Sequence, residues 1–239
     1  VYKRQKIISL FSCIIISSIL LKFCEDFEVF VVVHLNQLLF NELLFRYITE
    51  IGNAVFLIAI VVPVLSLLSY SSNHFKYVPL RIFLIPGIFL GIFVQLIKEV
   101  LNFPRPATNE RLLSDESIIF LEPIFFQGAY PSGHTASIFF VFYVFYRFGK
   151  KISDYYSSAV FFLLFVLASV VAVSRIILGA HWLSDVIGAA GISMLFVELL
   201  KHKTIQKFLR ENTYINIFSI LLVGLAFYAL FFLEAFDYL

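Results

Sequence analysis

Two titratable residues, His181 and Asp185, lie four positions apart in a stretch that joins two long apolar runs, residues 174–190. Residues four apart on one helix share a face, so the carboxylate of Asp185 can hold the imidazole of His181 in one tautomer and one orientation. An imidazole held in this way can act as a nucleophile or as a base. The alternative is a polar contact between packed helices. Because titratable groups near lipid are costly, we favour a functional pair.

A second stretch, YPSGHTAS at residues 130–137, combines the start of a helix with small polar groups. Pro131 is followed there by Ser132 and Gly133, which present a hydroxyl beside exposed backbone N–H groups. These groups and the positive end of the helix dipole form a suitable cradle for an anion. His134 is expected in the same first turn. By itself the stretch is equally typical of an ordinary N-cap with an incidental histidine.

A third stretch, KEVLNFPRP, begins at Lys98 and contains Arg105. Proline disfavours the helical conformation of the residue before it, so Phe103 and Arg105, each followed by a proline, are expected to be extended. This geometry returns Arg105 over the end of the helix that carries Lys98. Taken alone, the two basic residues are more typical of anchors whose charged ends reach the membrane surface.

Together the three stretches supply the groups that phosphoryl transfer requires. The groups that can surround a tetrahedral dianion such as phosphate are Lys98, Arg105, Ser132, Gly133 and Arg175. His134 and His181 supply a nucleophile and a proton donor, in an order that the residues alone do not fix. No convincing cluster of carboxylates accompanies them, because Glu99 is turned away from the face that Lys98 occupies. We therefore predict phosphoryl transfer without a metal ion or another cofactor.

In this order the stretches resemble the motifs of the type 2 phosphatidic acid phosphatase (PAP2) superfamily, whose pattern is K-x6-RP, then PSGH, then SR-x5-H-x3-D. The matching positions are Lys98, Arg105, Pro106, the run 131–134, Ser174, Arg175, His181 and Asp185. The joint occurrence of three motifs is far more specific than any one of them. The resemblance implies that His181 forms a phosphohistidine, that Asp185 orients it and that His134 protonates the leaving group.

The resemblance also implies that the phosphoryl oxygens are bound by Lys98, Arg105, Ser132, Gly133 and Arg175. The soluble members of the superfamily lack membrane spans, so this apolar chain is similar to the membrane branch, whose members hydrolyse lipid phosphates. The substrates compatible with the resemblance are phosphatidic acid, phosphatidylglycerol phosphate, undecaprenyl pyrophosphate and the phosphates of lipid A. Two alternatives stay open: a lipid phosphotransferase that uses the same intermediate, and a membrane protein that binds a lipid phosphate without catalysis.

The composition indicates that membrane helices hold these motifs. The 239 residues are 61% hydrophobic and 14% charged, and they include 30 Phe; the mean hydropathy is +0.94. These values predict an all-α, polytopic transmembrane helix bundle. The formal net charge of +2 is too small for a nucleic-acid partner, so the lipid bilayer and a membrane lipid phosphate are the expected partners. The sequence makes no prediction of the oligomeric state.

Seven segments are predicted to span the membrane, the fourth of them being shorter than the rest. They are residues 7–23, 51–70, 80–102, 133–147, 157–177, 182–200 and 214–235. The first six form the core, and the seventh is an addition at the C-terminus. We therefore expect a single integral membrane domain, 1–239, that comprises an N-terminal anchor and interfacial helix in 1–50, a motif core at about 80–200 and an extra segment at 208–239.

The basic clusters near residues 3–6, 74–77, 147–151 and 201–207 belong on the cytoplasmic side by the positive-inside rule. Alternation of the spans then brings all three motif stretches to the opposite face. This topology places the site at the outer face of a bacterial-type inner membrane, toward the periplasm or the exterior. Residues 31–48 mix apolar and polar side chains and are expected to form an amphipathic helix in the interface.

Small residues in two of the spans predict close helix packing. Gly87 and Gly91 form a GxxxG pair in the third span. Gly188, Ala189 and Ser193 give the sixth span a face of small residues.

Overall fold

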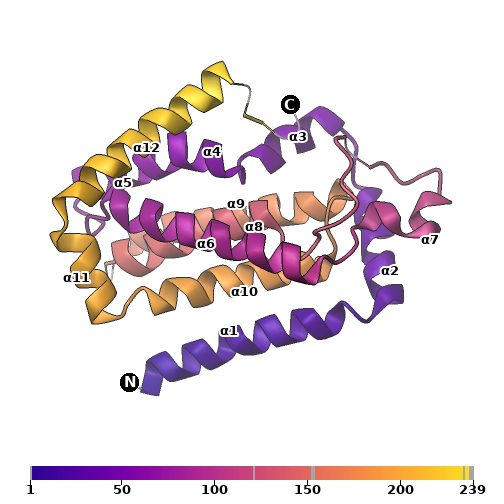
Figure 1. Ribbon diagram of the computed structural model, residues 1–239, viewed down its shortest axis with the longest axis horizontal. Helices are drawn as coiled ribbons and strands as arrows, with labels where there is room; N and C mark the ends of the chain where they lie inside the picture. Colours follow the sequence, from indigo (N-terminus) through magenta and orange to yellow (C-terminus); the bar gives the residue numbers. More distant parts are fainter. Residues whose placement is uncertain (1, 121, 152–153, 234, 237–239) are drawn as a thin grey trace.

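The structure is a computed structural model that describes residues 2–120, 122–151, 154–233 and 235–236. No β-strand occurs among these residues, and the longest helices lie alongside one another (Figure 1). The helical elements are α1 (Tyr2–Leu21), α2 (Glu25–Asn36), α3 (Glu42–Glu50), α4 (Ala54–Phe56), η1 (Leu57–Val61), α5 (Val62–Ser71), α6 (Leu80–Leu101), η2 (Pro106–Thr108), α7 (Glu110–Leu113), α8 (Gly133–Val144), η3 (Phe145–Gly149), α9 (Tyr155–Ile177), α10 (Leu183–Leu199), α11 (Lys203–Glu211) and α12 (Thr213–Phe232). The predicted all-α class is therefore confirmed.

Helix α8 forms the centre of the bundle. It packs against α6, α9 and α10, while α1 covers the other side of α10. Nearly every side chain from Thr135 to Phe145 is buried, including four phenylalanines. A helix that is apolar on all sides can be surrounded by other helices or by lipid, and here α6, α9 and α10 surround α8. The first turn of α8 carries His134.

Every predicted span is present as a helix or a helical run. Four segments are long and apolar enough to cross a membrane: Ala54–Ser71, Leu80–Leu113, Tyr155–Ile177 and Thr213–Phe232. Two bent pairs, Ile7–Leu21 with Glu25–Asn36 and Leu183–Leu199 with Lys203–Leu209, raise the number to six if each pair is one span. The short central run, α8 continued by η3, is not among these six. The protein is an integral membrane protein, and the count of seven crossings remains a prediction.

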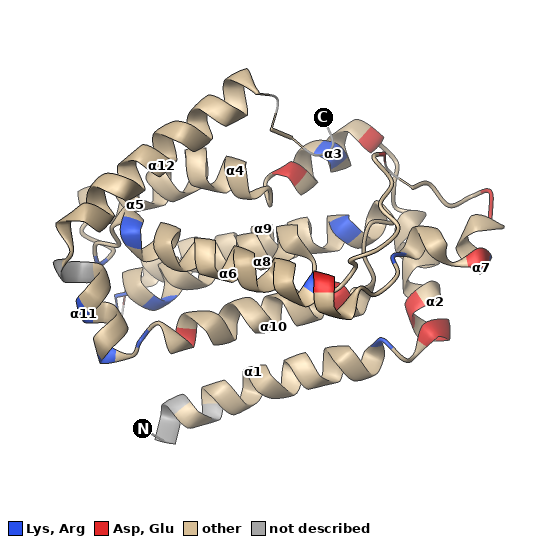
Figure 2. Ribbon diagram, viewed as in Figure 1, with Lys and Arg blue, Asp and Glu red and all other residues tan. Residues whose placement is uncertain are grey.

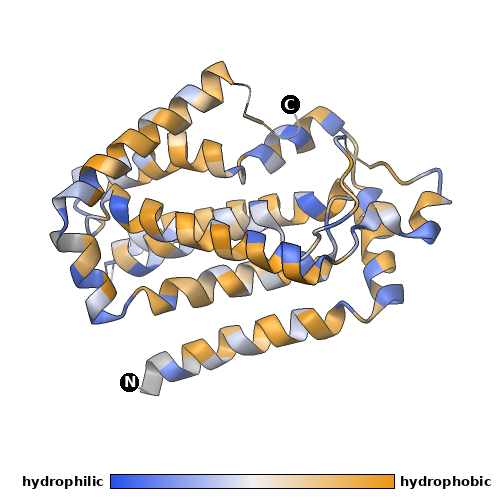
Figure 3. Ribbon diagram, in the orientation of Figure 1, coloured by the Kyte–Doolittle hydropathy of each residue, from blue (hydrophilic) through white to orange (hydrophobic). Residues whose placement is uncertain are grey.

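Charged residues gather mainly toward the two ends of the bundle (Figure 2), and the helices between them are predominantly apolar (Figure 3). One end carries the basic residues of α11, and the other carries the acidic residues of α2 and α7. An apolar band between two charged ends is the pattern that a bilayer requires of a helical membrane protein.

The predicted amphipathic helix at 31–48 is two helices, because the chain breaks between α2 and α3. The side chain of Asn41 begins α3 by accepting a hydrogen bond from the Leu44 N–H group at 3.0 Å. Helix α2 is bent by 94° from α1 and so lies across the end of the bundle (Figure 1). At its end the amide of Asn36 donates to the carbonyl groups of Ile119 and Ile177, at 2.8 and 2.7 Å. These hydrogen bonds join α2 to the end of α9 and to the loop between α7 and α8.

The small residues behave differently in the two spans. A Cβ atom at Gly188 would lie 2.4 Å from the ring of Tyr130, so this position requires glycine, although Tyr130 lies in the loop before α8. On the same span the Ser193 hydroxyl donates to the carbonyl of Ala136 in α8 at 2.8 Å, so close packing of these two helices is present. At Gly91 a Cβ atom would meet no described atom within 4 Å, so the predicted helix contact is missing there among the described residues. A Cβ atom at Gly87 would lie 3.3 Å from the ring of Phe140 in α8. The GxxxG pair of α6 lines a cavity instead of another helix backbone.

Candidate active site

The three motif stretches meet at the end of the bundle where α2 lies. The backbone N–H group of Ser132 donates to the carbonyl of Asp185 at 3.2 Å. The indole N–H group of Trp182 donates to the carbonyl of Pro104 at 2.9 Å. These two hydrogen bonds join the start of α8 and the segment after α6 to the start of α10, so residues far apart in the sequence share one site.

Arg105 is extended, as the proline that follows it predicts. Asn102 ends the helix in the left-handed conformation, with φ of 41°, and Arg105 is extended, with φ of −89° and ψ of 167°. Its guanidinium donates to the carbonyl groups of Gln127 at 3.0 Å and Ala180 at 3.4 Å, and it lies 5.0 Å from the ring centre of Phe125. These contacts fix the direction of a cationic side chain that is only 8% exposed.

His181 contacts Asp185, but they do not share a helix face. Helix α10 begins at Leu183, so His181 precedes the helix while Asp185 lies in its first turn. The Asp185 carboxylate reaches back, accepting the backbone N–H of Trp182 at 2.8 Å and lying 3.3 Å from Nδ1 of His181 through the same oxygen. The predicted contact is therefore present with a different geometry, because the chain turns at Gly179, where φ is 64°, before the helix starts.

Lys22, at the end of α1, completes the surroundings of Asp185 and was not predicted from the sequence. Its ammonium nitrogen lies 2.7 Å from the second carboxylate oxygen of Asp185. It also lies 5.5 Å from the ring centre of Trp182 and 5.7 Å from that of Phe103. The only sequence signal is a single lysine at the outer end of an apolar helix, which is equally typical of a membrane anchor.

Glu28 in α2 is a second buried residue that the sequence did not reveal. Its carboxylate accepts the backbone N–H groups of Leu183 at 2.9 Å and Ser184 at 3.2 Å. These are the first N–H groups of α10, so the side chain of Glu28, which belongs to α2, caps the N-terminus of α10. The contact fixes the start of α10, on which the position of Asp185 depends.

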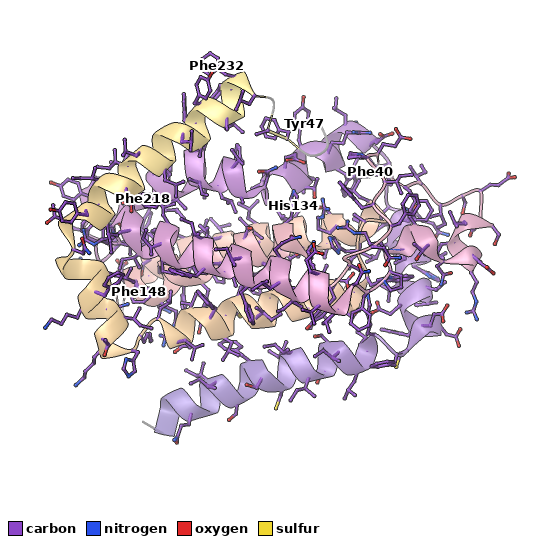
Figure 4. All side chains as sticks on the ribbon, viewed as in Figure 1. Phe40, Tyr47, His134, Phe148, Phe218 and Phe232 are labelled. Atoms are coloured by element: carbon purple, nitrogen blue, oxygen red, sulfur yellow. The ribbon has the colours of Figure 1, made fainter. Side chains whose placement is uncertain are left out.

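His134, labelled in Figure 4, occupies the first turn of α8. Among the described contacts, its Nε2 atom lies 4.0 Å from Oε1 of Glu50, the last residue of α3. The other oxygen of Glu50 accepts the side-chain amide of Asn53 at 3.0 Å. Glu50 is 2% exposed. A buried carboxylate therefore faces the second histidine, as Asp185 faces the first.

The second arginine of the site, Arg175, lies at the end of α9. Arg175 is 2% exposed and donates from Nη1 to the hydroxyl of Thr49 at 2.7 Å. The positive charges of Lys98, Arg105 and Arg175 act on both imidazoles. Because buried positive charge is stable only beside negative charge or hydrogen-bond acceptors, a site with this charge pattern favours an anionic ligand.

The start of α8 lies in the same region. Ser132, its N-cap residue, is fully buried, and within the described part of the chain its side chain makes no capping hydrogen bond to the helix. Its hydroxyl accepts a hydrogen bond from the Thr135 hydroxyl at 3.0 Å. A Cβ atom at Gly133 would meet no atom within 4 Å, so space adjoins the first helical residue. This arrangement fits the predicted anion cradle.

The structure thus brings together every residue that the sequence proposed for the site. In the described ranges, no three His, Cys, Asp or Glu side chains are grouped so that they could hold a metal ion. Independence from a metal ion remains a prediction about the reaction.

The chain belongs to the PAP2 superfamily, because the model of that family matches residues 79–208, more than half of the sequence. Two solved structures share its fold. LpxE from Aquifex aeolicus is 23% identical with a TM-score of 0.53, covering 74% of this chain and 96% of its own. A transmembrane PAP2-type phosphatidylglycerolphosphate phosphatase from Bacillus subtilis is 18% identical with a TM-score of 0.55, covering 84% and 95%. No curated protein matches the chain.

Proposed function

We propose that the protein is a lipid phosphate phosphatase that works through a phosphohistidine intermediate. The observation that carries the proposal is the pairing of His181 with Asp185 where three cationic side chains act on both histidines. A buried imidazole with an orienting carboxylate and an adjacent anion site is the arrangement that nucleophilic phosphoryl transfer needs.

In the first step the Nε2 atom of His181 attacks phosphorus, because Nδ1 faces Asp185. An N–P bond forms while the P–O bond to the lipid breaks, and His134 donates a proton to the leaving oxygen. Asp185 accepts the Nδ1–H hydrogen bond and stabilises the positive charge on the phosphorylated ring.

In the second step His134, now neutral, accepts a proton from a water molecule that attacks the phosphohistidine. The N–P bond breaks, inorganic phosphate leaves and the imidazole of His181 is restored. In both steps Lys98, Arg105 and Arg175, with the N–H groups at the start of α8, stabilise the charge on the phosphoryl oxygens.

The substrate class is a phosphomonoester or pyrophosphate of a membrane lipid. Phosphatidic acid, phosphatidylglycerol phosphate, undecaprenyl pyrophosphate and the phosphates of lipid A all carry the group that the site accepts. The positions of the basic clusters support an active site at the outer face of a bacterial-type inner membrane.

The proposal is tested by phosphate release from these four lipids by detergent-purified protein in the presence of EDTA. We expect release from at least one lipid and its loss in His181→Ala. His34→Ala is the matched control, since His34 is an exposed histidine of α2 whose ring bonds only locally to the carbonyl of Phe30 among the described contacts.

Each alternative gives a different result in this assay. Transfer of phosphate to an added lipid acceptor, without free phosphate, would identify a phosphotransferase. Saturable lipid binding without turnover by folded protein would identify a binding protein. Release by His181→Ala at the parent rate would show that His181 is not the nucleophile.

A further inference from the structure

A cavity of about 730 Å³ leads away from the candidate active site. Lys98, Gly133 and His134 line one part of it, and the remaining walls come from the segment 52–62, from α6 and α8, and from residues 235–236. Those walls are mostly apolar and include Phe83, Leu90 and Phe140. A cavity of this size is within the usual range for binding sites of small ligands, about 300–1,000 Å³.

The glycines of α6 create part of this space. Gly87 and Gly91 both line the cavity, and a Cβ atom at Gly91 would meet no atom within 4 Å. Glycine inside a helix costs roughly 0.5–1 kcal/mol relative to alanine. Among the described residues, no neighbouring helix comes close enough to Gly91 to require glycine. The missing side chain therefore widens the cavity.

The C-terminal segment closes the cavity on another side. Helix α12 lies beyond the residues that match the family model, and it packs against α4, η1 and α6. After α12 the chain runs toward α3 (Figure 1), and Ala235 and Phe236 line the cavity. Phe236 packs against the apolar cluster that α12 forms with the segment Ala54–Val61.

Two hydrogen bonds and one longer polar contact link this segment to the second histidine. The side-chain amide of Asn53 donates to the carbonyl of Ala235 at 3.3 Å and to Glu50 at 3.0 Å. Glu50 in turn lies 4.0 Å from His134. Ala235 is thus connected, through Asn53 and Glu50, to the place where the leaving group would be protonated.

We propose that the cavity binds the hydrocarbon chain of the substrate lipid, and that Ala235 and Phe236, which follow α12, form a wall that selects its length. The proposal rests on the proposed function, because the phosphate must occupy the adjacent cationic site. A lipid phosphate fits because it joins an anionic group to an apolar chain, as the cavity joins cationic and apolar walls. Burial of each methylene group of the chain is favourable, so the cavity contributes binding energy that increases with chain length.

The first test fills the cavity with Gly91→Leu and measures hydrolysis of butyl phosphate and hexadecyl phosphate. We expect the ratio of kcat/KM for the long substrate to that for the short one to fall about tenfold, which corresponds to lost burial of about two methylene groups. Gly224→Leu in α12 is the matched control, since a Cβ atom there also meets no atom within 4 Å and Gly224 does not line the cavity. Leucine favours helix over glycine in both variants.

The second test opens the wall with Phe236→Ala and measures a series of alkyl phosphates from butyl to hexadecyl. We expect the preferred chain length to increase. Phe232→Ala is the control, because Phe232 is 68% exposed and is the last residue of α12 (Figure 4). Size-exclusion chromatography shows whether each variant is folded.

The outcomes separate the inference from the proposed function. If the parent hydrolyses alkyl phosphates but both cavity variants keep its chain-length profile, the cavity does not bind the chain and the inference is wrong. A shift equal to that of the control variants leads to the same conclusion. If the folded parent releases no phosphate from any alkyl phosphate or lipid, the proposed function itself is wrong.

Discussion

The ammonium group of Lys22 lies 2.7 Å from the carboxylate of Asp185, which joins the end of the first helix to the residue that orients His181. The side chains of Lys22 and Asp185 are 8% and 0% exposed. Because the carboxylate has no access to solvent, its negative charge is stabilised by Lys22, the Trp182 N–H group and the histidine instead of by water. The end of helix α1 therefore contributes a side chain to the candidate active site.

Lys22→Met is expected to impair both stability and turnover. Removal of one partner of a buried ion pair typically destabilises a protein by about 3–5 kcal/mol, because the other charge remains buried. We also expect kcat to fall at least about tenfold, equivalent to about 1.4 kcal/mol of transition-state stabilisation. Thermal unfolding in detergent and steady-state kinetics measure the two effects.

Lys22→Arg keeps the charge and should recover part of the lost turnover. Lys76→Met, at an exposed lysine, serves as the control. If Lys22→Met retained the parent kcat, the ion pair between Lys22 and Asp185 would have no influence on catalysis by His181.

Asp185→Asn is expected to lower kcat far more than it changes KM. The amide cannot stabilise a positively charged imidazole, and the loss of an orienting carboxylate in a comparable triad reduces kcat by about 10⁴-fold. The phosphate-binding cations remain in place, so substrate binding should change little. The kinetics of Asp115→Asn, in the loop after α7, provide the comparison. An effect confined to KM would instead indicate a structural role.

Glu50→Gln is expected to slow substrates with poor leaving groups more than those with good ones. A carboxylate about 4 Å from an imidazole favours its protonated form, which is the form that protonates a lipid alkoxide. Since p-nitrophenolate leaves without a proton, the rate with p-nitrophenyl phosphate should fall less than the rate with an alkyl phosphate.

Glu99→Gln is the control for Glu50, because Glu99 is exposed and accepts a hydrogen bond from Gln95 on the same helix. Equal losses with both substrates would contradict a role of Glu50 in proton donation.

Vanadate is expected to inhibit the enzyme and EDTA to leave its rate unchanged. Vanadate adopts the five-coordinate geometry of phosphoryl transfer, and a site complementary to the transition state binds such analogues tightly. Phosphate release is measured with increasing vanadate, and separately after treatment with EDTA. Loss of activity in EDTA that magnesium restores would overturn the prediction of metal-independent chemistry.

The sequence determined the features that depend on composition and on local backbone constraints. The apolar content predicted a helical membrane protein, because a bilayer leaves few other ways to pair backbone groups. The proline after Arg105 predicted its extended backbone, since proline restricts the residue before it. Three spaced motifs were enough to predict the family and the residues that meet at the site.

Only the tertiary structure showed the residues that act across helices. Lys22, Glu28 and Glu50 contact the site from elements distant in sequence, and no spacing rule connects a side chain to a partner more than eighty residues away. The same limit explains why Gly91 was assigned to helix packing, although it borders a cavity. Local chemistry selects the residues, whereas the packing of α1, α3 and α12 around the motif helices decides what surrounds them.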